Sequence, residues 1–142
     1  MSLRRLLIYI VTAILLVTPV LSGCGSSQDA ATQANGLPAP GRISPDNYQN
    51  FFVQKKAQYL LIDVRTPEEF ASGFIAGAVN IPVNQLSQRL NEVPQDEPVV
   101  VYCHSGNRSH QASQILEDAG YSQVYDLGGI SQWQAAGMPV QR

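Results

Sequence analysis

The sequence predicts an α/β domain built on a doubly wound parallel β-sheet of about five strands, with helices on both faces. Residues 59–64 and 98–102 form near-continuous apolar runs, as expected of strands that are covered on both sides. Segments with helical spacing alternate with the strand-like runs, which favours parallel crossovers over hairpins. The chain of 142 residues has room for one such domain with additional segments.

Capping signals locate the helices of the first half of the domain. Ser44 followed by Pro45 predicts a helix that runs to about residue 56, and Thr66 followed by Pro67 predicts a short helix through Phe70. Apolar runs and spacing predict the other elements of this half: strands over 59–64 and 78–82 and a helix over 83–91.

The second half repeats the alternation. The run 98–102 predicts the central strand, and apolar residues at 112, 115, 116 and 119 predict an amphipathic helix that Gly120 ends. Residues 123–127 predict the last strand, and a short final helix carries Trp133.

The N-terminus has the features of an export signal. Arg4 and Arg5 precede an apolar run over 6–20, which is shorter than the roughly 20 residues of a spanning helix and ends in small residues. Leu21-Ser22-Gly23-Cys24 resembles the lipobox of bacterial lipoproteins, which implies cleavage of residues 1–23 and lipid on Cys24. An uncleaved anchor helix is the alternative. Both place the protein on the bacterial cell membrane, and we expect the domain outside the cytoplasm, on the periplasmic or extracellular face.

The segment that follows predicts a tether. Residues 24–41 are rich in Ser, Ala, Gln, Gly and Pro and have no apolar periodicity, so we interpret them as a lipidated flexible linker before a domain at 42–142. The net charge is −2 and no basic run is present, so the sequence gives no indication of nucleic-acid binding.

A lone cysteine stands between the central strand and the amphipathic helix, in the run 103–109 (CHSGNRS). Backbone amides of a glycine-containing loop and a helix N-terminus favour a thiolate there, and Arg108 adds a cation that can bind an oxyanion. A lipidated Cys24 could not pair with Cys103, which leaves a free thiol suited to nucleophilic catalysis. The alternative is that Cys103 is an ordinary buried core thiol.

Asp63, Arg65 and Cys103 all lie at or just past strand ends, where ligands gather in parallel sheets. We expect Asp63 and Arg65 to form a supporting ion pair rather than to take part in the chemistry.

Several motifs in order resemble the rhodanese domain: residues 63–70 with 73–82, the loop 103–109, and the C-terminal segments 118–121 and 127–130. The resemblance implies a sulfurtransferase in which Cys103 attacks the sulfane sulfur of a donor such as thiosulfate. The resulting persulfide passes its sulfur to cyanide or a thiol, and no metal or organic cofactor is needed. The resemblance implies that the donor contacts the rest of the loop: His104, Ser105, Gly106, Asn107, Arg108 and Ser109.

One position departs from the family pattern, because Phe74 stands where the family often has histidine. Two other functions remain open: a persulfide carrier, sensor or binding module without turnover, and a cysteine phosphatase. The phosphatase loop has one more residue between cysteine and arginine than this chain, so we expect the present loop to fit a sulfur atom better than a phosphate ester.

Overall fold

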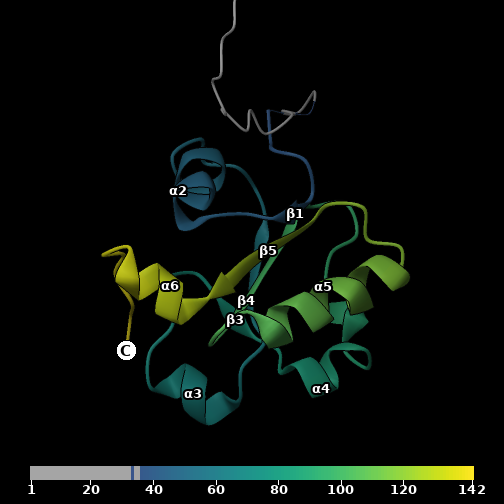
Figure 1. Ribbon diagram of the computed structural model, residues 1–142. Helices are drawn as coiled ribbons and strands as arrows, with labels where there is room; N and C mark the ends of the chain where they lie inside the picture. Colours follow the sequence, from purple (N-terminus) through teal and green to yellow (C-terminus); the bar gives the residue numbers. More distant parts are fainter. Residues whose placement is uncertain (1–32, 34–35) are drawn as a thin grey trace, which may run out of the picture.

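The computed structural model describes residue 33 and residues 36–142. Its centre is a sheet of five parallel strands in the order β1-β5-β4-β2-β3 (Figure 1). The strands are β1 (Gly41–Arg42), β2 (Leu60–Asp63), β3 (Val79–Asn80), β4 (Val99–Cys103) and β5 (Val124–Gly129). The predicted fold class is therefore confirmed.

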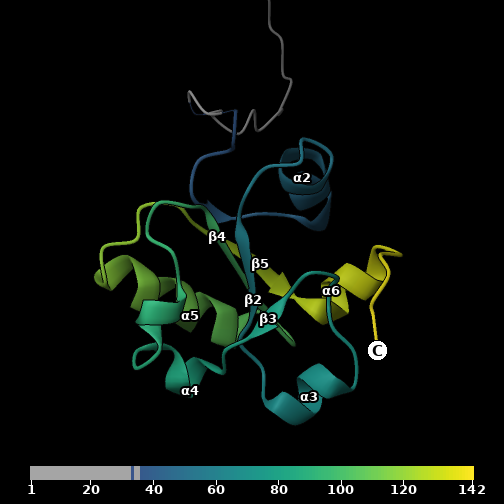
Figure 2. The same cartoon turned by 180° about the vertical axis from the view of Figure 1, so that it is seen from behind.

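Helices cover both faces of the sheet. Helices α4 (Val83–Leu86) and α5 (Asn107–Asp118) lie on one side, and α2 (Pro45–Tyr48) and α6 (Ile130–Ala135) lie on the other (Figures 1 and 2). Alternate residues of β4 supply both cores, because successive strand side chains point to opposite faces. Val101 and Cys103 join the α5 side, whereas Val100 and Tyr102 join the α2 side.

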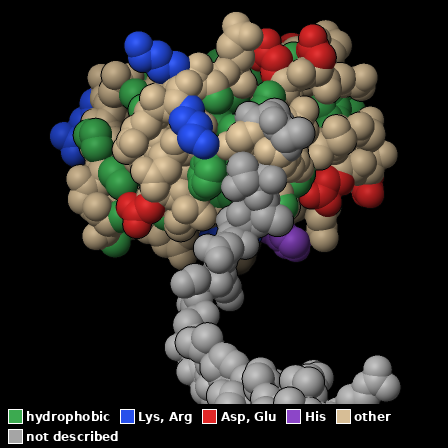
Figure 3. Space-filling model, turned by 90° about the horizontal axis from the view of Figure 1, so that it is seen from above, with side chains coloured by type: hydrophobic (Ala, Val, Ile, Leu, Met, Phe, Trp, Pro, Cys, Tyr) green, Lys and Arg blue, Asp and Glu red, His purple; other side chains and the backbone are tan. Residues whose placement is uncertain are grey.

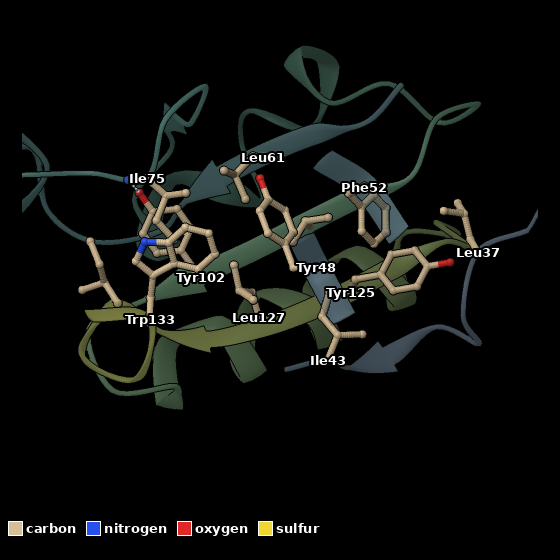
Figure 4. Packing of buried hydrophobic residues seen from close by; sticks show 12 residues of the cluster. Leu37, Ile43, Tyr48, Phe52, Leu61, Ile75, Tyr102, Tyr125, Leu127 and Trp133 are labelled. Carbon is tan, nitrogen blue, oxygen red and sulfur yellow. Dashed lines mark hydrogen bonds between the residues drawn. The ribbon is translucent and has the colours of Figure 1, made fainter. Parts of the chain in front are cut away.

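Aromatic rings dominate the core on the α2 side (Figure 4). Phe52 contacts Tyr125 edge-to-face, with ring centroids 5.0 Å apart, and Tyr48 contacts Trp133 at 5.5 Å. Such contacts add to the stabilisation from burial. Trp133 thereby anchors the C-terminal helix beside the ends of the strands.

The two helices with cap-and-proline signals begin where the sequence predicts. The Ser44 hydroxyl accepts a hydrogen bond from the Asn47 amide at the start of α2. Thr66 and Glu69 form a capping box at the start of α3 (Pro67–Ala71). After Tyr48 the first helix continues as a π-helical segment, η1 (Gln49–Val53), rather than as α-helix.

The helix predicted over 83–91 is divided in the structure. Helix α4 ends at Leu86, and a 3₁₀ turn, η2 (Leu90–Glu92), follows it. The Tyr121 hydroxyl lies 2.9 Å from the Leu90 carbonyl and 2.8 Å from the Val93 carbonyl. The Tyr121 hydroxyl thus contacts the segment that follows the break, and this tertiary contact has no local sequence pattern.

The packed region includes residues ahead of Arg42. Leu37 is buried in the core, and the Tyr125 hydroxyl donates to the Pro38 carbonyl. Within the described residues no helix is both long and apolar enough to cross a bilayer. The export segment, Cys24 and most of the predicted tether lie outside the described residues.

Charged side chains are dispersed on the face seen in Figure 3, where acidic and basic groups lie among uncharged ones. This face shows no continuous basic surface, in agreement with the mildly acidic composition.

Candidate active site

The loop after β4 turns back over the cysteine that ends the strand. Gly106 makes the turn at φ +108°, a backbone conformation that a residue with a side chain rarely adopts, and α5 begins at Asn107. This turn aims the Gly106 amide at the cysteine, and its N–H donates to Cys103 Sγ with an N–S distance of 3.0 Å. Such a bond stabilises negative charge on sulfur.

Cys103 is fully buried (0 % exposed), and its Sγ lies 3.8 Å from the hydroxyl of buried Ser109. That hydroxyl lies 3.0 Å from the carbonyl of Gly106 and 3.3 Å from that of Gly128. Cys103 is thus as buried as a core thiol, but its sulfur has polar neighbours, the Gly106 amide and the Ser109 hydroxyl. A reactant reaches the sulfur only when the groups that cover it move.

The start of α6 holds the other side of the loop. Both the amide and the hydroxyl of Ser131 donate to the His104 carbonyl, at 3.3 and 2.9 Å. Gly129 packs so closely that an added β-carbon would lie 2.5 Å from the same carbonyl oxygen and 2.9 Å from the Cα of Ser105. Only glycine fits there without displacing the loop.

Arg108 lies in the first turn of α5 and pairs with Glu69 of α3. Its Nη1 is 2.6 Å from Glu69 Oε2 and its Nη2 is 2.8 Å from Oε1, a bidentate geometry between two side chains that are each 33 % exposed. Hydrogen bonding to Arg108 lowers the pKa of Glu69 to about 2. Glu69 Oε2 also accepts the Thr66 amide, so this carboxylate joins α3 to the active-site loop.

Asp63 and Arg65 form a buried ion pair, as expected. Arg65 Nε lies 2.9 Å from Asp63 Oδ1, and its Nη2 donates to Asp63 and to the Gly73 carbonyl at 2.7 Å. Burial alone would lower the pKa of Arg65, but hydrogen bonding to Asp63 raises it above its ordinary value. Asn80 Nδ2 donates to the Asp63 and Arg65 carbonyls, so the pair joins β2, β3 and the loop at Gly73.

A third arginine at this site was missed by sequence reasoning. Arg42 leaves β1 with its guanidinium against Gly106 and Gly128, and it bonds Asp126 Oδ2 at 2.9 Å and Gln132 Oε1 at 3.2 Å. The sequence gives no indication of this role for Arg42, because β1 has only two residues and is too short to show a periodic pattern.

The remaining predicted loop residues face solvent. His104, Ser105 and Asn107 are exposed. His104 lines a cavity of about 160 Å³ together with Arg65, Ser72, Gly73, Ile130, Gln134, Val140 and Arg142. A larger cavity of about 350 Å³ lies at the opposite end of the strands, near Phe51 and Pro98, and none of the loop residues lines it.

Phe74, the departure from the family pattern, stacks on Phe70 with ring centroids 4.4 Å apart. Its amide donates to the Gln141 carbonyl at 2.9 Å, so it also helps to hold the C-terminal segment. Among the described residues, no cluster of three or more His, Cys, Asp or Glu side chains could hold a metal ion.

The fold and the loop define a small α/β domain in which Cys103 is held at the end of the middle strand and accepts a hydrogen bond from a backbone amide. A family model for the rhodanese-like domain matches residues 44–136. The chain therefore belongs to the rhodanese-like domain family.

Named relatives share this domain. The chain is 45 % identical to a sulfurtransferase of Allochromatium vinosum over 82 residues, which cover 57 % of this chain and 77 % of the relative. It is 41 % identical to the thiosulfate sulfurtransferase PspE of Escherichia coli over 71 residues, covering 49 % and 68 %. The crystal structure of a rhodanese-related protein from Thermoplasma volcanium aligns with a TM-score of 0.62 at 34 % identity, covering 70 % of this chain and 96 % of that one.

Proposed function

We propose that this protein is a sulfurtransferase that moves a sulfane sulfur from a donor, such as thiosulfate, to a thiophilic acceptor through a persulfide on Cys103. The observation that carries the proposal is the 3.0 Å hydrogen bond from the Gly106 amide to Cys103 Sγ, at the N-terminus of a 12-residue helix. A thiolate is the nucleophile in such a reaction, and both the amide and the helix terminus favour it.

The transfer proceeds in two displacements. The Cys103 thiolate attacks the outer sulfur of the donor, a sulfur–sulfur bond forms to Sγ, and the rest of the donor leaves with the bonding electron pair. Cyanide or a thiolate then attacks the outer sulfur of the persulfide, and the Cys103 thiolate is regenerated. The Gly106 amide is placed to stabilise the thiolate at the start and the end of this cycle.

Mass spectrometry tests the proposal. The reduced protein is incubated with thiosulfate and digested, and the peptide with Cys103 should gain the mass of one sulfur atom. Addition of cyanide should remove that mass and release thiocyanate. No adduct on Cys103 with thiosulfate or with a persulfide donor would rule out sulfur transfer.

The complete burial of Cys103 favours a second candidate, a persulfide carrier or binding module without turnover. A carrier would acquire the sulfur and retain it when cyanide is added, and a binding module would acquire none. The phosphatase alternative is tested by turnover of an aryl phosphate that depends on Cys103, which we expect to be absent.

We further propose that the protein is anchored to the bacterial membrane through lipid on Cys24, with the domain outside the cytoplasm. The proposal is supported by the basic start, the short apolar run and the lipobox-like sequence ahead of Cys24. Expression with a labelled palmitate should label the wild type and not Cys24→Ser. Equal labelling of both chains would contradict it.

A further inference from the structure

Three arginines surround the active-site loop, and each is neutralised by one carboxylate. Arg42 pairs with Asp126, Arg65 with Asp63, and Arg108 with Glu69. Arg42 ends β1, Arg65 lies in the loop after β2 and Arg108 lies in α5, yet all three meet near the ends of the strands. Fixed cations therefore contribute little net positive charge to the cradle around Cys103, and the amides of the loop supply its positive potential.

Arg108 is the arginine whose neutralisation by a carboxylate should most affect the binding of a sulfur donor. It lies within the loop motif itself, five residues after Cys103, but both of its terminal nitrogens are bonded to Glu69. The pair uses two of the five N–H donors of the guanidinium and cancels its charge, so Arg108 attracts a second anion less strongly than a free arginine would. The overall charge of the chain, −2, also opposes the approach of a multiply charged anion.

Arg142 is a further cation at this end of the sheet, but it lines the cavity near Ile130 and Gln134. Ile130 belongs to the core on the α2 side, whereas Cys103 packs with the core on the α5 side. His104, the residue next to Cys103, lines the same cavity, so the contribution of Arg142 has to be measured with a variant of its own.

We propose that the preferred donor is the persulfide of a thiol, R–S–SH, rather than thiosulfate, and that Glu69 sets this preference by neutralising Arg108. The proposal rests on the sulfurtransferase function proposed above. A persulfide carries at most one negative charge, whereas thiosulfate carries two and releases sulfite, which also carries two.

The chemistry of the step is balanced without a further reactant. The Cys103 thiolate attacks the terminal sulfur of R–S–SH, and the new bond joins Sγ to that sulfur. The sulfur–sulfur bond of the donor breaks, and the thiolate R–S⁻ leaves with the electron pair. The proton stays on the transferred sulfur, and the leaving group needs no arginine because it has a single charge.

The test compares persulfide formation on Cys103 from two donors at low ionic strength, where the Debye length is about 30 Å. The donors are thiosulfate and the persulfide of 2-mercaptoethanol, and quenched samples are quantified by mass spectrometry. The wild type should react faster with the persulfide. Glu69→Gln should raise the rate constant for thiosulfate about three- to tenfold and change that for the persulfide much less, because Arg108 regains its net charge.

The conservative change to glutamine keeps an acceptor for the Thr66 amide, so the capping box is retained. The matched control is Glu92→Gln, which removes a carboxylate from a similar bidentate pair with Arg89, at 2.6–2.7 Å, outside the site. This control should leave both rate constants unchanged. The charge-balanced double variant Glu69→Gln/Arg108→Gln should return the donor ratio toward the wild-type value.

Three results would overturn the inference while leaving sulfur transfer intact. These are a wild type that prefers thiosulfate, a donor ratio that Glu69→Gln does not alter, and a selective loss of thiosulfate reactivity in Arg142→Gln. In contrast, failure of both donors to modify Cys103 would overturn the proposed function itself.

Discussion

Gly129 and His104 are in closer contact than any residue with a β-carbon would allow. A β-carbon on Gly129 would lie 2.5 Å from the His104 carbonyl oxygen, which itself accepts two hydrogen bonds from Ser131. The backbone of β5 and the backbone of the active-site loop therefore position each other directly. The geometry of the loop depends on this contact as much as on the loop's own sequence.

Gly129→Ala should displace the loop and slow persulfide formation at least about tenfold, with a loss of about 1–3 kcal/mol in unfolding free energy from overpacking. Denaturant unfolding and the rate of persulfide formation provide the measurements. Gly77→Ala is the control, because Gly77 has φ +83° but an added β-carbon would meet no atom within 4 Å. It should lose about 1–2 kcal/mol through backbone strain and retain normal reactivity. Equal losses of reactivity in both variants would show that the contact has no special role.

Cys103→Ser should abolish sulfur transfer and leave the fold intact. The serine hydroxyl is nearly isosteric with the thiol and can accept the hydrogen bond from the Gly106 amide, but it does not ionise in the physiological pH range. Thiocyanate release measures the activity, and thermal unfolding measures the fold. Residual transfer in this variant would mean that another group carries the sulfur.

The Glu69–Arg108 pair should stabilise the protein by about 1 kcal/mol after allowance for its partial exposure. The pKa of Glu69 is lowered from 4.5 to about 2, so this contribution is present above pH 4.5 and is lost as the pH falls from 4.5 toward 2. The difference in unfolding free energy between the wild type and Glu69→Gln should follow this course in urea titrations at several pH values. A difference that does not change over that range would contradict the assignment.

Asp63→Ala should destabilise the protein by about 3–5 kcal/mol, because it leaves the buried guanidinium of Arg65 without its carboxylate. Replacement of both partners, in Asp63→Ala/Arg65→Met, should recover part of this loss because no uncompensated charge remains buried. Denaturant unfolding of the two variants and the wild type tests this. A double variant less stable than Asp63→Ala would show that Arg65 stabilises the Gly73 loop mainly through its other hydrogen bond.

The local parts of the fold could be predicted from the sequence because their causes are local. The apolar runs gave the central strands, and Thr66 with Pro67 marked the start of α3, where the capping box forms. The division of the helix after Leu86 could not be predicted, because the segment that follows the break is held by Tyr121, which lies 31 residues after Leu90.

The candidate site shows the same limit. The loop 103–109 and the Asp63–Arg65 pair could be identified from residue types and short spacing. The partner of Arg108 could not, because Glu69 is 39 residues away and any of several carboxylates could have served. The only sequence signal for this partner was the position of Glu69 as the third residue of α3. A capping glutamate uses one carboxylate oxygen for the Thr66 amide, and its other oxygen can accept a further hydrogen bond. Arg42 had no such signal, since its partner Asp126 is 84 residues away.

The pairing of β1 with β5 joins the two ends of the domain, since Gly41 lies opposite Tyr125 and Arg42 opposite Asp126. A ribosome must therefore synthesise the chain through β5 before this edge of the sheet can close. Until then Arg42 lacks its carboxylate, Asp126, and its contact at Gly128, and the reaction centre of the nascent chain is incomplete. The order of synthesis thus delays the assembly of the site until β5 has left the ribosome.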